Sequence, residues 1–243
     1  MGYRTLTELE SDIRHQFDLD GFEQRHTQAQ IFRLVNESIR EMRKLVTERG
    51  SSQYLATVAA TAGPSASSGY SGSLVTFYGG ADPRIEMIRS VMAQGSSGGW
   101  YQLDQIPLQY LAADGTRDDI TGKPTGWVLL GWNVEKIQSS PSSQYRQVLI
   151  VPPLNSTYNL RVIYLPGWTD AISTDRVMDD NGNLEWVKWR VGCKVAERDN
   201  LPELASRKQQ LKELEREMFD RATREGSPVR SRIAVKRMVA RRW

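Results

Sequence analysis

The chain has 243 residues, of which 39% are hydrophobic and 25% charged, so it is expected to fold as a globular protein and not to be disordered throughout. Its formal net charge is +3, and its single cysteine, Cys193, excludes an internal disulfide and a zinc centre built on several cysteines. No apolar run reaches the roughly 18–20 residues that span a bilayer. The first residues also lack the hydrophobic core of a signal peptide, so we expect a soluble protein made in the cytoplasm.

Two amphipathic helices are predicted at the start of the chain, the first over residues 5–17 and the second over about residues 27–49. Each begins with residues that can form a capping box, Thr5 with Glu8 and Thr27 with Gln30. The second helix has one continuous apolar stripe, formed by Ile31, Leu34, Val35, Ile39, Met42, Leu45 and Val46. Residues 1–50 are therefore expected to supply the N-terminal helices of a helical bundle.

The middle of the chain is typical of short antiparallel strands separated by turns. Residues 51–72 are rich in Ser, Ala, Thr and Gly and predict a loose connection with one strand near residues 54–59. Further strands are predicted at residues 74–78, 85–92, 100–103, 108–111, 127–134, 147–151 and 157–165. In the last of these, Tyr158, Leu160, Val162 and Tyr164 fall on one face. Residues 51–168 are expected to form an inserted antiparallel β module, either a sandwich or a curled sheet.

After residue 168 the pattern returns to helix. One buried face is predicted from Leu184, Val187, Val191 and Val195, followed by a break at residues 200–202. A highly charged helix with a narrow apolar seam then runs to about residue 225, where we expect Gly226 and Pro228 to end it. Residues 169–226 should complete the bundle with the N-terminal helices, which makes the fold class α+β.

Residues 227–243, here called the basic tail, differ from the rest of the chain in composition. They contain no acidic residue and six basic ones, namely Arg230, Arg232, Lys236, Arg237, Arg241 and Arg242. Apolar residues are interleaved with these cations, among them Ile233, Val235, Met238, Val239 and Trp243. This mixture predicts an extended C-terminal tail, which could dock in a groove of another protein as an extended or a helical peptide. A frayed, solvated end is the alternative.

Residue types that carry catalysis or bind metals are sparse. The only histidines, His15 and His26, are predicted on the surface, and Cys193 is predicted in the core. Residues 179–183 resemble a fragment of a calcium loop, but their glycine occupies the wrong position, so a solvated turn is favoured. We therefore expect no enzyme, no cofactor and no metal site. A hydrolase with an unrecognised site stays open as an alternative, although no residue in the sequence supports it.

Three patches of sequence occur in a recognisable order. The first has Leu6–Leu9 followed by a helix carrying residues 34–41, and the second is a strand that ends in the Pro-Pro turn of residues 147–153. The third is the alternating strand of residues 158–166, with a loop into a late helix. Together they cover about half of the chain, which resembles the head-to-tail adaptor (head completion or connector) family of tailed bacteriophages.

This resemblance implies a virion protein at the head–tail junction. Such adaptors form a cyclic homo-oligomer, expected to be a dodecamer, beneath the portal protein. The ring extends the channel through which genomic DNA passes without sequence-specific binding, and it offers a platform to tail or nozzle proteins. The C-terminal arm commonly reaches the portal. This assigns portal or partner binding to Arg230, Arg232, Ile233, Val235, Lys236, Arg237, Met238, Arg241, Arg242 and Trp243. A nucleic-acid-binding protein that uses the basic tail on phosphates is the alternative from another class.

Overall fold

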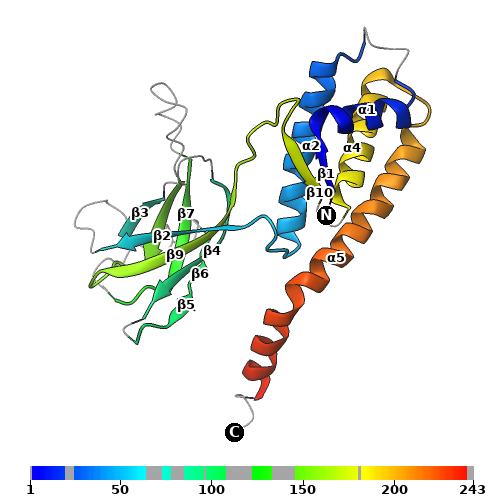
Figure 1. The fold of residues 1–243 in the computed structure, drawn as a ribbon. Helices are drawn as coiled ribbons and strands as arrows, with labels where there is room; N and C mark the ends of the chain where they lie inside the picture. Colours follow the sequence, from blue (N-terminus) through cyan, green and yellow to red (C-terminus); the bar gives the residue numbers. More distant parts are fainter. Residues whose placement is uncertain are drawn as a thin grey trace, which may run out of the picture. The chain divides into compact units, whose positions relative to one another are not determined.

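The structure, a computed structural model, describes residues 2–19, 25–63, 73–77, 85–95, 97–107, 122–132, 146–179 and 182–239. The fold is α+β, and the chain divides into two units (Figure 1). The first, helical unit consists of Met1–Tyr54 and Trp168–Trp243, and the second, β unit is Leu55–Gly167. The β unit is thus inserted in sequence between the two halves of the helical unit.

The helical unit begins with helices α1 (Leu6–Gln16) and α2 (Gln28–Glu48). Both predicted capping boxes are confirmed: the Thr5 side chain accepts from the Glu8 amide and the Thr27 side chain from the Gln30 amide. Helices α4 (Asn183–Asp199) and α5 (Leu204–Val239) follow the β unit. Asn200 ends α4 in the left-handed conformation, with φ of 52°, and the short connection makes α4 and α5 antiparallel neighbours.

One hydrophobic core joins these helices, and residues of all four contribute to it. Its buried members include Leu9 and Ile13 of α1, Ile31 and Ile39 of α2, Val187 and Val191 of α4, and Leu211 and Met218 of α5. Cys193 is fully buried in this core, as predicted. A two-stranded sheet that the sequence did not predict accompanies the helices: β1 (Gly2–Thr5) pairs antiparallel with β10 (Arg176–Asp179).

Asn36 of α2 forms hydrogen bonds to residues 168–171, the segment that follows the β unit in the chain. Its side-chain oxygen accepts hydrogen bonds from the Trp168 indole N–H at 2.8 Å and from the Ala171 amide at 2.9 Å. Its side-chain amide donates to the carbonyls of Phe32 and Ala171, both at 3.1 Å. Because only 5% of Asn36 is exposed, these four bonds satisfy a buried polar group and fix residues 168–171 on α2.

A buried arginine, Arg43 of α2, contacts residues at both junctions with the β unit. The guanidinium carbon of Arg43 is 5.5 Å from the centroid of the Tyr54 ring and 5.4 Å from that of the Trp168 ring. Tyr54 is the last residue before the β unit and Trp168 the first after it. The two connections of the inserted unit therefore meet on one side chain of α2, through cation–π contacts.

Helices α1 and α4 approach each other closely at Gly192. A Cβ atom at this position would lie 2.4 Å from Cζ of Phe17. The Phe17 ring cannot easily move aside, because it packs edge-on against Trp189 at 5.3 Å and lies 4.8 Å from the guanidinium carbon of Arg207. Gly192 is therefore required by packing, not by backbone conformation.

We expect Gly192→Ala to lower the free energy of unfolding. Overpacking a core costs about 1–3 kcal/mol, which exceeds the gain of up to about 1 kcal/mol from alanine in a helix. Urea denaturation of the two proteins measures the difference. If the contact is responsible, adding Phe17→Leu should recover part of the loss, and strictly additive effects would contradict this explanation.

The β unit contains two four-stranded sheets. The first has the strand order β2 (Ala56–Ala62), β9 (Tyr158–Pro166), β4 (Ile85–Gln94) and β5 (Trp100–Gln102). The second has the order β3 (Ser73–Phe77), β8 (Arg146–Val151), β7 (Gly126–Trp132) and β6 (Asp104–Gln105). The strand pairs are antiparallel except β6 with β7, which is parallel.

Both sheets bury side chains in one core, which makes the β unit a sandwich. The core contains Val75, Trp127 and Ile150 from one sheet and Val91, Leu160 and Val162 from the other. Along β9, Leu160, Val162 and Tyr164 are buried while Asn159 and Arg161 are exposed, as the alternation predicted. The strand predicted at residues 108–111 lies outside the described residues.

The prediction that Gly226 and Pro228 end the last helix is wrong, because α5 continues to Val239. An extended tail from residue 227 is therefore not what the described part of this segment shows. Glycine and proline in a helix cost about 1 and 3 kcal/mol, respectively. Good helix formers such as Arg, Ala, Lys and Met lie on either side of these two residues, so a helix already formed upstream propagates across them.

Candidate functional site

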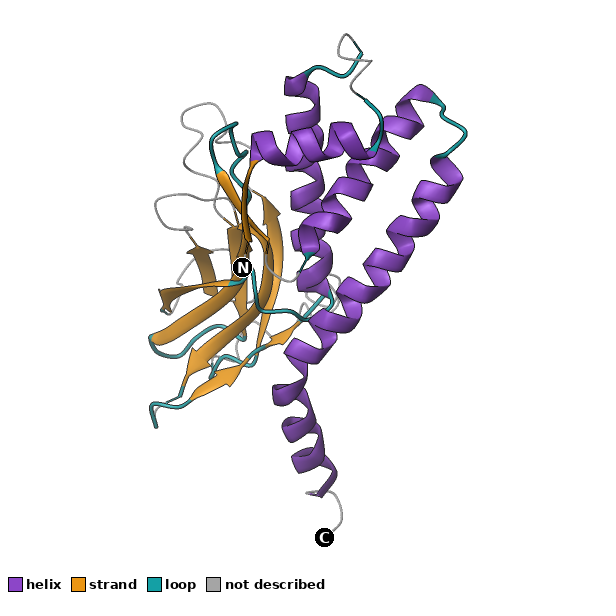
Figure 2. Ribbon diagram, turned by 45° about the vertical axis from the view of Figure 1, so that its right-hand side comes forward, coloured by secondary structure: helices purple, strands orange, loops and turns teal. Residues whose placement is uncertain are grey.

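Helix α5 is much longer than the helices that it packs against. It spans 36 residues and α4 spans 17, or about 54 Å against about 26 Å. The guanidinium carbon of Arg49, where α2 ends, lies 4.3 Å from the centroid of the Phe219 ring. A Cβ atom at Gly182, where α4 begins, would lie 3.3 Å from Nη1 of Arg221. Beyond residue 221, α5 therefore continues past both helices for about 27 Å (Figure 1, Figure 2).

The basic tail coincides with this projecting part of the chain. The positions of Arg230, Arg232, Ile233, Val235, Lys236, Arg237 and Met238 fall within the last turns of α5. Arg241, Arg242 and Trp243 lie outside the described residues. Ala222 is the last buried core residue on α5 among the side chains that the structure describes, which on this helix extend to Thr223.

A network of ion pairs links α2 to α4. The Glu41 carboxylate lies 2.7 Å from Arg190 Nε and 3.0 Å from Lys194 Nζ. Lys194 Nζ is also 3.5 Å from the Glu37 carboxylate. Burial raises the pKa of the Glu41 carboxyl, but the hydrogen bonds and charges of Arg190 and Lys194 outweigh it. The pKa of Glu41 is therefore held below its ordinary value of 4.5.

The lowered pKa of Glu41 predicts a pH-dependent contribution to stability. A carboxyl whose pKa is lower in the folded state stabilises the fold above its unfolded pKa, and this contribution is lost as the pH falls through the folded pKa. Wild type should be more stable than Glu41→Gln at pH 7, and the two thermal melting curves should converge as the pH falls below 4.5. A difference that stays constant from pH 7 to pH 3 would contradict the assignment.

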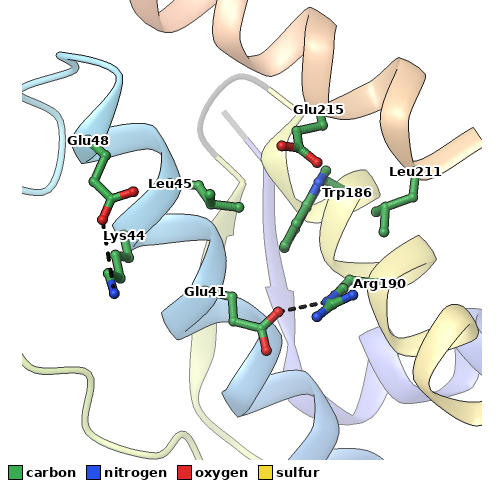
Figure 3. Close-up of a pocket in the computed structure, with 8 residues that line it drawn as sticks. All are labelled: Glu41, Lys44, Leu45, Glu48, Trp186, Arg190, Leu211 and Glu215. Carbon is green, nitrogen blue, oxygen red and sulfur yellow. Dashed lines mark hydrogen bonds and ion pairs between the residues drawn. The ribbon is translucent and has the colours of Figure 1, made fainter. Parts of the chain in front are cut away.

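A groove of about 400 Å³ lies between α2, α4 and α5 (Figure 3). Helix α2 contributes Glu41, Lys44, Leu45 and Glu48, α4 contributes Trp186 and Arg190, and α5 contributes Leu211 and Glu215. The groove thus combines carboxylates on its rim with the apolar surfaces of a tryptophan and two leucines. Sequence reasoning missed it, because its residues come from three helices far apart in the sequence.

Trp186 leaves a hydrogen-bond donor unused in this groove. The residue is only 3% exposed, yet its indole Nε1 has no hydrogen-bond partner among the described residues. Figure 3 shows this nitrogen on the side of Glu215. Glu215 is half-buried and makes no ion pair with any described residue. A buried N–H group without an acceptor is costly, so this arrangement favours an incoming group that brings one.

The prediction that His26 lies on the surface is wrong. It is 2% exposed, and its Nε2 lies 2.7 Å from the Asp199 carboxylate at the end of α4. The residue precedes α2 in sequence, but tertiary packing places it against α4, which helical periodicity does not reveal. His15 is exposed, as predicted.

The described residues provide no obvious catalytic or metal centre. Burial raises the pKa of the Cys193 thiol, which disfavours the reactive thiolate. Within the described ranges, no group of three or more His, Cys, Asp or Glu side chains could hold a metal ion. No helix in the same part of the chain is long and apolar enough to cross a membrane.

Comparison with known proteins adds no family to this description. No protein-family model matches the chain, and the search of curated proteins found no match. The resemblance to phage adaptors therefore stays a prediction. The projecting part of α5 and the groove between α2, α4 and α5 are the features of the described chain that point to a function.

Proposed function

We propose that this protein is a structural virion protein, a head-to-tail adaptor that forms a ring and docks on the portal. The ring would extend the DNA channel and provide the platform for tail attachment. The observation that carries the proposal is the projection of α5 beyond α2 and α4. A helix that continues about 27 Å past its neighbours, and that holds the positions of four of the tail's six cations, is suited to being held by another protein.

The helical unit then serves as a bundle that carries the tail. Cations of the tail meet carboxylates or carbonyl groups of the partner, which are strong and directional contacts. The apolar residues fill pockets, with Trp243 as the anchor. The portal- and partner-binding residues in this proposal are Arg230, Arg232, Ile233, Val235, Lys236, Arg237, Met238, Arg241, Arg242 and Trp243.

The proposed partners are the portal protein, tail or nozzle proteins, and further copies of the chain in a cyclic homo-oligomer, expected to be a dodecamer. Neighbours in such a ring join through two different surfaces. Genomic DNA passes through the channel without sequence-specific contacts. The protein is made in the host cytoplasm and acts at the head–tail junction.

Electron microscopy of the purified protein mixed with the portal of the same virus tests the proposal. We expect a second ring stacked coaxially on the portal ring, absent from images of the portal alone. Portal rings that stay bare at micromolar concentrations of both proteins would contradict the proposal.

The second candidate function is nucleic-acid binding through the tail. It is favoured by one observation, six basic residues without an acid in residues 227–243. Six phosphate contacts would give a slope of about −5 for log K against log salt concentration. A salt titration of duplex DNA binding, with and without the tail, distinguishes the two: tight binding of this steepness that is lost with the tail would favour the nucleic-acid function.

A further inference from the structure

The groove between α2, α4 and α5 has three neighbouring features that a ligand can satisfy: a hydrogen-bond donor, a carboxylate and an apolar surface. Trp186 Nε1 needs an acceptor, and the Glu215 carboxylate, which has no ion pair with a described residue, can receive a cation. Leu45 and Leu211 supply apolar surface in the same groove (Figure 3). A peptide segment with arginines, backbone carbonyls and a large apolar side chain meets all three needs. The volume of about 400 Å³ falls in the range of protein binding pockets.

We propose that this groove binds residues 240–243 of a second copy of the chain. This segment carries Arg241, Arg242 and Trp243, and it continues directly from the end of α5. In the bound state a guanidinium pairs with Glu215, a backbone carbonyl accepts from Trp186 Nε1, and the Trp243 ring packs against the leucines. Charge complementarity favours this occupant, because the segment has two cationic side chains and no acidic one, whereas the groove is lined by three carboxylates and two cations.

The segment cannot occupy the groove of its own chain. Val239 lies 24 residues beyond Glu215 on the same helix, which is about 36 Å. Four extended residues reach at most about 14 Å. The donor and the groove must therefore belong to different molecules.

This inference goes beyond the proposed function, because it concerns contacts between copies and needs no portal. Each chain offers one groove and one segment, which are different surfaces. Such heterologous contacts build closed rings or open filaments. Within the tail, residues 240–243 then hold a neighbouring copy, and the helical residues 227–239 stay available to the portal.

Sedimentation velocity of the full-length protein, measured without portal over a range of concentrations, tests the proposal. We expect concentration-dependent self-association that weakens with salt. Glu215→Gln should weaken it about tenfold, since a charge-assisted contact is lost. Trp186→Phe, which keeps an aromatic ring but removes the N–H, should weaken it about fivefold. Glu213→Gln, the same change at an exposed position of α5, is the matched control and should leave association within about twofold.

Removal of residues 240–243 should abolish the association without changing the circular dichroism of the fold. A wild-type protein that stays monomeric would overturn the proposal. So would unchanged association in both Glu215→Gln and Trp186→Phe, which would indicate that the two side chains serve their own subunit. Portal binding distinguishes this inference from the proposed function. A protein lacking residues 240–243 that binds portal but no longer self-associates supports the inference. Loss of portal binding with intact self-association overturns it.

Discussion

Deletion of residues 227–243 is expected to abolish attachment to the portal and to leave a folded protein. On α5, Ala222 is the last core residue among the side chains that the structure describes, and the end of α2 and the start of α4 lie beside Phe219 and Arg221, respectively. The deletion therefore removes no residue of the described core. It removes all six cations of the tail, four of which lie in residues 227–239, the part that stays available to the portal. Since single anchor residues are each worth about 2 kcal/mol or more, portal binding should fall by more than about a hundredfold.

A pull-down with tagged portal measures this effect, and circular dichroism with a thermal melt verifies the fold. Replacing Arg230, Arg232, Lys236 and Arg237 by glutamine keeps the length of the helix and tests the cations alone. The matched control replaces four exposed cations outside the tail by glutamine, namely Arg33, Lys208, Lys212 and Arg216. Normal portal binding by the truncated protein would refute the assignment of the tail.

Asn36→Ala is expected to lower the free energy of unfolding by about 2–4 kcal/mol. The substitution removes four hydrogen bonds at once, two accepted and two donated by the Asn36 side chain. The Trp168 N–H and both backbone groups of Ala171 lose a partner in a half-buried setting. The segment that returns from the β unit should therefore loosen first, which hydrogen exchange of the Ala171 amide would detect.

Asn36→Asp gives the informative comparison, because it keeps an oxygen that accepts from Trp168 and Ala171. Its loss of stability should be smaller than that of Asn36→Ala if the accepted bonds dominate. Asn155→Ala, at an exposed position, should change the free energy of unfolding by no more than about 0.5 kcal/mol. Equal effects of Asn36→Ala and Asn155→Ala in urea denaturation would contradict the role of Asn36.

The helices and most strands could be predicted from the sequence, because caps, turns and apolar periodicity involve residues close together in the chain. The capping boxes at Thr5 and Thr27 fix where α1 and α2 begin, and Asn200 and Leu201 mark the end of α4. The alternation along β9 reflects one buried face of a sheet. Each of these patterns depends on residues within a few positions of one another.

The features that the sequence did not reveal depend on residues distant in the chain. β1 pairs with β10 across more than 170 residues, and His26 finds Asp199 over a similar separation. The groove requires Glu215, Trp186 and Leu45 to meet from three helices. Periodicity states which face of a helix is buried, but not against which partner. The continuation of α5 through Gly226 and Pro228 shows in addition that local breakers do not always end a helix.

The arrangement around Arg43 has a consequence for the engineering of the chain. Tyr54 and Trp168 contact the same guanidinium, so the polypeptide departs for the sandwich and comes back at one spot. A domain inserted in this manner can be replaced by a short turn. The helices should need little rearrangement, because the two chain ends that the turn must bridge are already adjacent.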